Sequence, residues 1–211
     1  MDCLRPTYAE IDLEALRHNY RLICAAAGDG TSLLAVVKAD AYGHGAVEVA
    51  RALVEEGAVM LAVALIEEAI KLRQAGLSAP ILVMGGILPG QEQYFLDHDL
   101  TPYVFNLETA DRLERVFRQS GKSCRYHLKI DTGMGRIGVQ PVNLEETLAA
   151  LNTFEHLKMA GLMTHFALAD VPASGLTDEQ ITRFRSLLQK VRQAGFYPEY
   201  IHAANSAGIF A

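Results

Sequence analysis

Short runs of apolar residues recur along the chain and alternate with longer segments of helical periodicity. Runs such as LLAVV at 33–37 and ILVM at 81–84 lack the strict alternation of a strand that faces water on one side. They predict strands buried on both faces, as in a parallel sheet covered by helices. We expect seven such strands, near residues 33–38, 60–65, 81–85, 101–105, 125–131, 159–165 and 200–205.

The segments between these runs carry helix start signals. Asn106 precedes a periodic segment and predicts a helix over 107–120 with an asparagine N-cap. Thr177 and Gln180 stand in capping-box spacing and predict a helix over 177–194. The apolar face of this second helix would consist of Ile181, Phe184, Leu187, Leu188 and Val191. A leading helix, from Asp12 to about Ala27, is expected to bury Leu13, Leu16, Tyr20 and Ile23.

Strands that alternate with helices indicate βα units and a parallel sheet, for which two architectures are common. A doubly wound sheet often has a GxGxxG fingerprint after its first strand, and this chain has none there. In a (β/α)8 barrel of the TIM type, functional side chains collect at the carboxyl ends of several strands. Seven polar residues occupy such positions here: Lys38, Asn106, Lys129, Asp131, His165, Asn205 and Ser206. We therefore predict an α/β fold of the barrel type, with residues 1–211 in one domain.

Composition and charge narrow the possible partners. The 211 residues have a net charge of −6 and no block of basic residues interleaved with aromatics, which argues against nucleic acid. The longest mostly apolar stretch, GAVMLAVALI, is too short to cross a bilayer, and the charged N-terminus has no signal-peptide pattern. The scattered Cys3, Cys24 and Cys124 form no CxxC spacing, so we expect reduced thiols, no metal site and a cytoplasmic location.

Lys38 is the first candidate for chemistry, because an apolar strand ends on it. A lysine in that position can be a solvated residue at the end of a strand. It can also be a partly desolvated amine with a lowered pKa, able to form a Schiff base with a carbonyl compound. Pyridoxal 5′-phosphate (PLP) is a carbonyl cofactor of this kind, and hydroxyl and backbone donors near Tyr42 and in the segment 205–208 could bind its phosphate.

Four motifs carry a resemblance to a known family. They are AVVKADAYGHG at 35–45, HLKIDTGMGRIG at 127–138, THFALAD at 164–170 and HAANSAG at 202–208. In their order and spacing they resemble motifs of the alanine racemases, and the resemblance covers essentially the whole chain. It implies an enzyme that uses PLP to interconvert L- and D-alanine, supplying D-alanine for peptidoglycan.

The resemblance also implies roles for individual residues. Lys38 would hold the cofactor covalently and act as the base for the D-enantiomer, while Tyr42 and Ser206 would contact the cofactor phosphate. Arg136 would meet the substrate carboxylate, which suits a planar and always charged guanidinium. His165 would help to position an arginine at the pyridine nitrogen.

Lys129 has two interpretations. In many members of the family the corresponding lysine is carbamylated, so that its carboxylate orients the arginine; the alternative is an ordinary buried lysine paired with Asp131. Among the histidines, His44 is predicted to be a structural loop residue, and His127 and His202 to be core histidines with satisfied ring nitrogens.

The chain departs from the family pattern at its C-terminal end. The resemblance implies an eighth strand and a second, β-rich domain that supplies the base for the L-enantiomer across a homodimer interface, and neither follows Ala211 here. We therefore expect little racemase activity from residues 1–211 alone. A different class of protein shares the barrel and the lysine: single-domain PLP-binding proteins of cofactor homeostasis. Their lysine motif differs from KADAYGHG, and GMGRIG is not expected in them.

Overall fold

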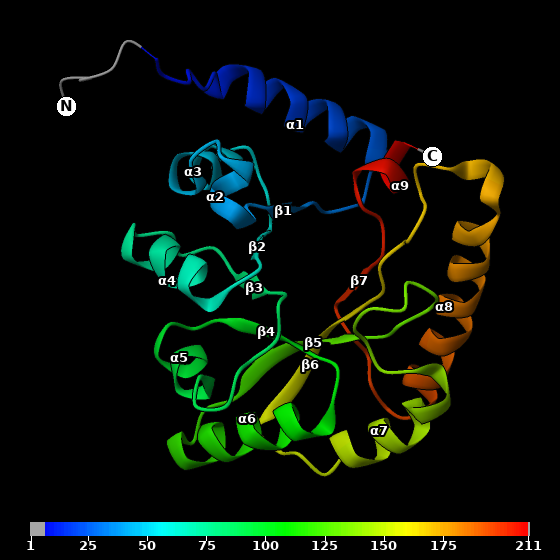
Figure 1. The fold of residues 1–211 in the computed structure, drawn as a ribbon. Coiled ribbons are helices and arrows are strands. Elements are labelled where there is room, and N and C mark those ends of the chain that lie inside the picture. The colour runs from blue at the N-terminus through cyan, green and yellow to red at the C-terminus, as the bar shows by residue number, and fades with distance from the viewer. Residues whose placement is uncertain (1–6, 211) are drawn as a thin grey trace.

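The computed structural model describes residues 7–210 and contains one sheet of seven parallel strands. The strands are paired in chain order, so that β1 and β7 form the two edges of the sheet. A doubly wound sheet would reverse its order at a switch point, whereas this sheet curls continuously into a half-barrel (Figure 1). All seven predicted strands are confirmed: β1 Leu34–Val36, β2 Met60–Val63, β3 Ile81–Val83, β4 Thr101–Val104, β5 Cys124–Lys129, β6 Leu157–Met163 and β7 Tyr200–His202.

Helices follow the strands and lie on the outer side of the curl (Figure 1). They are α1 Leu13–Ala27, α2 Lys38–Tyr42, α3 Ala46–Glu55, α4 Ile66–Gln74, α5 Glu92–Asp97, α6 Leu107–Ser120, α7 Leu144–Leu151, α8 Leu176–Gln193 and α9 Ser206–Phe210. Two short 3₁₀ turns, Pro141–Asn143 and Pro172–Ser174, precede α7 and α8. Across residues 7–210, none of the helices combines the length and apolar character needed to cross a membrane.

Strands β2, β3 and β4 are buried on both faces, as the uninterrupted apolar runs predict. The prediction holds only in part for the run at 33–37, because β1 is an edge strand and its Val36 is 38% exposed. On β2, Leu61 and Val63 belong to the large cluster between the sheet and the helices. Met60 and Ala62 belong to a second cluster on the opposite face, with side chains from β3, β4 and β6. Because successive side chains point to opposite faces, every residue of such a strand is apolar.

The helix ends follow the sequence signals in one case and not in another. The side chain of Asn106 accepts the N–H of Thr109 at 2.8 Å, which confirms the predicted cap of α6. The prediction of a capping box formed by Thr177 and Gln180 at the start of α8 is wrong. Gly175 is the N-cap of this helix, and the Thr177 hydroxyl is buried without a hydrogen-bond partner. The Gln180 side chain turns instead toward the loops of the barrel.

The leading helix begins after Asp12, as expected, but is less buried than its pattern suggests. Tyr20 is buried, whereas Leu13, Leu16 and Ile23 are only half-buried. The physical reason is position, since α1 packs mainly on α3 and α9 at the side of the molecule. Cys24 and Cys124 are free thiols; Cys3 lies outside the described residues.

Candidate active site

The structure places all six predicted site residues at or after the carboxyl ends of strands. Lys38 follows β1, Lys129 is the last residue of β5, and His165 follows β6. Ser206 comes four residues after β7, at the start of α9. Tyr42 and Arg136 stand in the segments after β1 and β5. Parallel strands bring their carboxyl ends to one rim of the sheet, which is where barrels build their active sites.

The segment after Lys38 has an unusual backbone. Ala39, Asp40, Ala41 and Tyr42 have φ values of 51°, 54°, 53° and 55°, so that α2 is a left-handed helical turn of non-glycine residues. Left-handed helical backbone costs about 1–2 kcal/mol for each L-residue, and runs of several such residues are rare. Strain of this kind persists only where surrounding groups hold it, and it is concentrated at functional sites.

Two carboxylates hold this turn. Glu68 of α4 accepts the N–H of Ala39 at 2.5 Å with one oxygen and the N–H groups of Ala64 and Leu65 at 2.8 and 2.9 Å with the other. Asp40 accepts the N–H of Ala46, the first residue of α3, at 3.0 Å, and its carboxylate also receives the ammonium group of Lys71 at 3.0 Å. The turn is therefore fastened to both neighbouring helices.

Sequence reasoning missed both Glu68 and Asp40. Glu68 could have been noticed as an acidic residue in the first turn of α4. Nothing in the sequence, however, connects it with Ala39, which lies 29 residues earlier. Asp40 belongs to the KADAYGHG motif, but its place there gives no indication of its bond to the N–H of Ala46.

The turn brings Lys38 and Tyr42 together. The Lys38 ammonium group lies 5.9 Å from the centre of the Tyr42 ring, with Lys38 half-buried and Tyr42 62% exposed. His44 bonds the carbonyl of Ala41 through Nδ1 at 2.8 Å, in keeping with its predicted structural role. The amine is thus partly shielded from water beside a phenol that stays open to solvent.

Lys129 is buried inside the curl of the sheet. Its ammonium group lies 5.6 Å from the centre of the Tyr103 ring and 3.4 Å from the sulfur of Met163. Burial, with the positive charge of Arg136 as a second cause, lowers the pKa of Lys129 to about 8 against the opposing influence of Asp131. An amine with this pKa is partly neutral near physiological pH.

The expected alternative, an ion pair between Lys129 and Asp131, is not formed. Asp131 accepts the N–H groups of Gly133 and Gly135 and an amide hydrogen of Gln140. Within the described part of the chain, no carboxylate forms an ion pair with Lys129. Asp131 shapes the loop and leaves the lysine without a counter-ion.

Arg136 stands on a loop that folds back against the strand before it. The N–H of Val139 bonds the carbonyl of Lys129 at 2.8 Å, and the N–H of Asp131 bonds the carbonyl of Val139 at 3.0 Å. Gly138 permits this return, because it has a φ of 141° and a Cβ there would lie 2.5 Å from the nitrogen of Asp131. The loop therefore projects Arg136, which is exposed, from the rim.

His165 shares an electrostatic environment with the cationic residues. Burial is the largest cause that lowers the pKa of His165. The positive charges of three residues add to it: Lys129, Arg136 and Lys38. The structure thus gathers a half-buried imidazole with a lowered pKa among side chains that carry positive charge, which suits a ligand with anionic groups.

A cofactor of the pyridoxal phosphate type fits this donor set. It needs an amine for its carbonyl carbon, and Lys38 is half-buried at the end of a strand. It also needs donors for a phosphate, and the hydroxyl-bearing residues Tyr42 and Ser206 are both exposed. Of the nearby carboxylates, Asp40 is paired with the ammonium group of Lys71, and Asp131 accepts N–H groups of its own loop.

Two histidines inside the sheet form a direct pair. Nδ1 of His127 lies 2.8 Å from Nε2 of His202, so that one ring nitrogen donates and the other accepts. The prediction of satisfied core histidines holds in part, because Nε2 of His127 is buried without a hydrogen-bond partner. Burial lowers the pKa of His127 to about 3 and that of His202 to about 4.

Comparisons with known proteins relate nearly the whole chain to one family. The family model described as "Alanine racemase, N-terminal domain" matches residues 11–211. The alanine racemase of Geobacter sulfurreducens is 43% identical over 209 residues, which is 98% of this chain and 55% of that protein. The alanine racemase of Symbiobacterium thermophilum is 44% identical over 209 residues, which is 99% of this chain and 55% of that protein.

Solved structures give the same result. Alanine racemase from Clostridium difficile 630 superposes with a TM-score of 0.94 at 38% identity, over 99% of this chain and 58% of the other. Alanine racemase from Streptomyces lavendulae gives a TM-score of 0.90 at 37% identity, over 97% of this chain and 55% of the other. The chain spans about half the length of the curated relatives it matches. From its sequence and its fold, the chain belongs to the alanine racemase family, in which it corresponds to the N-terminal domain.

Proposed function

We propose that the protein to which this chain belongs interconverts L- and D-alanine with PLP and supplies D-alanine for peptidoglycan. The observation that carries the proposal is the match to the racemase family over residues 11–211. At the rim of the sheet, this chain places Lys38 near the positive charges of Lys129 and Arg136. Alanine racemases depend on PLP. When bound, this cofactor supplies an electron sink for the pair of electrons left on the α-carbon of alanine.

The residues of this chain supply binding and proton transfer. Lys38 holds the cofactor and, once its amine is free, takes or returns the α-proton on one face of the substrate. Tyr42 and Ser206 donate hydrogen bonds to the phosphate. Arg136 binds the substrate carboxylate through its guanidinium, whose two parallel N–H groups match the two oxygens. His165, whose pKa is lowered chiefly by burial, would help to position an arginine at the pyridine nitrogen.

Lys129 is proposed to act through Arg136. Its pKa of about 8 leaves part of the amine neutral. The neutral nitrogen would bond to the carbon of carbon dioxide and release one proton to solvent, giving a carbamate. The resulting negative charge would lie near Arg136 and would orient its guanidinium toward the substrate. The absence of an ion pair to Asp131 leaves the amine available for this reaction.

Racemisation also needs a base on the second face of the substrate. We propose that this base comes from a second domain of a partner subunit, so that the working enzyme is a cytoplasmic homodimer in which residues 1–211 belong to one barrel domain. The single continuous sheet, with one large core packed along its outer face, supports the assignment to one domain. Light scattering of the full-length protein would measure its oligomeric state.

The decisive experiment is a racemisation assay. Full-length protein is incubated with D-alanine and PLP, and the products are separated by chiral chromatography. We expect L-alanine to accumulate toward an equal mixture, and L-serine in a parallel reaction tests the preference for alanine. No L-alanine above a cofactor-free control would contradict the proposal. Cofactor binding without turnover would favour the second class, the single-domain PLP-binding proteins.

A further inference from the structure

The side chain of Gln180 on α8 is fully buried, although glutamine is a polar residue usually found at the surface. Its oxygen accepts the N–H of Ala167 at 2.9 Å. Its amide nitrogen donates to the hydroxyl of Thr132 at 3.1 Å and to the carbonyl of His165 at 3.0 Å. The acceptor and both donors of one side chain are therefore engaged away from its own helix.

These partners belong to two different loops of the rim. Thr132 lies in the loop after β5, which carries Arg136, and Ala167 lies in the loop after β6, which carries His165. A direct bond of 2.7 Å between the hydroxyls of Thr132 and Thr164 joins the same two loops beneath Gln180. The glutamine thus closes a small buried network between them.

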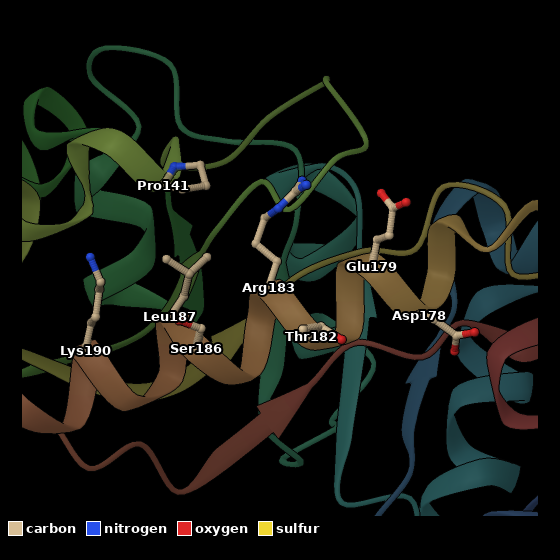
Figure 2. Close-up of a pocket in the computed structure, with 8 residues that line it drawn as sticks. All are labelled: Pro141, Asp178, Glu179, Thr182, Arg183, Ser186, Leu187 and Lys190. Carbon is tan, nitrogen blue, oxygen red and sulfur yellow. The ribbon is translucent and has the colours of Figure 1, made fainter.

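Arg183, one turn further along α8, reaches the same loop. It extends from the helix toward the loop, along the groove that α8 forms with Pro141 (Figure 2). Its guanidinium donates to the carbonyl of Thr132. Gly133 lies against both side chains and has a φ of 145°, a backbone conformation that L-residues with a Cβ rarely adopt.

Only a side chain with one hydrogen-bond acceptor and two donors can make all three contacts at position 180, and glutamine has both. A leucine would fill the space but leave the Ala167 N–H without an acceptor, and an unsatisfied buried group costs more than a lost bond. A glutamate could accept from Ala167 but could not donate to the His165 carbonyl. Buried polar networks that are fully satisfied hold their members in one arrangement.

We propose that Gln180 is a positioning residue for the active site, which fixes the loop that carries Arg136 against the loop that carries His165. The inference rests on the proposed function, in which these two side chains face the substrate and cofactor. Gln180 touches neither ligand and acts through the backbone of the two loops. Arg183 reinforces the first of them.

The test compares three variants of the full-length protein. Gln180→Leu removes every polar contact of the network, and Gln180→Glu keeps the acceptor for Ala167 and loses the donors. Phe184→Leu is the matched control, because Phe184 is buried on the same helix in the apolar core and its loss weakens packing only. Amide hydrogen exchange is measured without cofactor, and KM and kcat for alanine are measured with it.

We expect Gln180→Leu to speed exchange in 164–170 and 131–138 about tenfold, the change that loss of one or two hydrogen bonds produces. KM should rise by a similar factor, with a smaller fall in kcat. Gln180→Glu should loosen the backbone around His165, whose carbonyl loses its donor, while Ala167 keeps most of its protection and the Thr132 hydroxyl can donate to the carboxylate. This variant decides the matter if the leucine variant does not fold. Phe184→Leu should change neither loop nor KM.

Two results would overturn the proposal: unchanged loop exchange and KM in both Gln180 variants, or equal changes in Phe184→Leu. Failure of the proposed function is seen separately. A wild-type protein that fails to racemise alanine would contradict that function, whereas an active wild type with an unaffected Gln180→Leu variant contradicts the positioning role alone.

Discussion

The carboxylate of Glu68 accepts the N–H of Ala39, although the two residues are 29 positions apart and belong to different βα units. Ala39 is the residue directly after Lys38 and belongs to the left-handed turn of α2. An acidic residue of the neighbouring helix therefore holds the backbone directly after the lysine. Glu68 therefore supports the proposed cofactor site without being one of the groups proposed to touch the cofactor.

Replacing Glu68 by alanine should weaken PLP binding and destabilise the protein. Three backbone N–H groups lose their acceptor, and the free energy of unfolding should fall by about 1–3 kcal/mol. Fluorescence titration with PLP and urea denaturation of the full-length protein measure the two effects. Glu68→Gln, which keeps an acceptor oxygen, should be intermediate. The exposed neighbour Glu67 is the matched control, and Glu67→Ala should leave PLP affinity unchanged.

Lys38 should be the residue that holds the cofactor. Borohydride reduction of the PLP-loaded protein, followed by peptide mapping, should place the pyridoxyl label on Lys38. The substitution Lys38→Arg keeps the positive charge and should remove both the label and the activity, the latter by at least about 10²-fold. A label found mainly on Lys129 or Lys122 would show that Lys38 is only a solvated lysine at the end of a strand.

Lys129 should take up carbon dioxide in a pH-dependent manner. Because its pKa is lowered to about 8, the neutral amine becomes abundant as the pH rises from 6 to 8, and carbamylation in bicarbonate should increase over this interval. Native mass spectrometry would detect the added mass, which Lys129→Met should abolish. Lys158 is exposed and serves as the control, since Lys158→Met should leave the uptake as it is. Equal uptake by the wild type and Lys129→Met would contradict the prediction.

The histidine pair should make stability depend on pH. The pKa of His127 is about 3 and that of His202 about 4, both below the ordinary value of 6.5. Between these values and pH 6.5 the unfolded chain binds protons that the folded chain does not. The free energy of unfolding should therefore fall as the pH is lowered from about 6.5 to 4, by up to about 1.4 kcal/mol per pH unit for each histidine.

Urea denaturation at several pH values would measure this slope. His127→Gln should flatten it, because one of the two buried imidazoles is removed. His18 is exposed on α1, and His18→Gln should leave the slope as it is. A wild-type slope that matches that of His127→Gln would show that other groups govern the acid sensitivity.

Local patterns in the sequence determined the order and type of the elements. All seven strands lie where apolar runs predict them, and Asn106 caps α6 as expected, because burial on both faces and helix capping are decided by residues close together in the chain. The same local reasoning failed at Gln180. Its spacing from Thr177 suggested a cap, but its side chain bonds Thr132, 48 residues earlier, which no local pattern can indicate.

Only the tertiary structure decided how the site is held. Alanine favours right-handed helix, so nothing in KADAY predicts a left-handed turn at Ala39 and Ala41. That turn exists because Glu68 and the first turn of α3 offer hydrogen bonds that the sheet brings within reach. Residue types at the ends of strands indicated which residues could form the site. The strained backbone after Lys38 and the contacts that hold it depend on segments that meet only when the sheet folds.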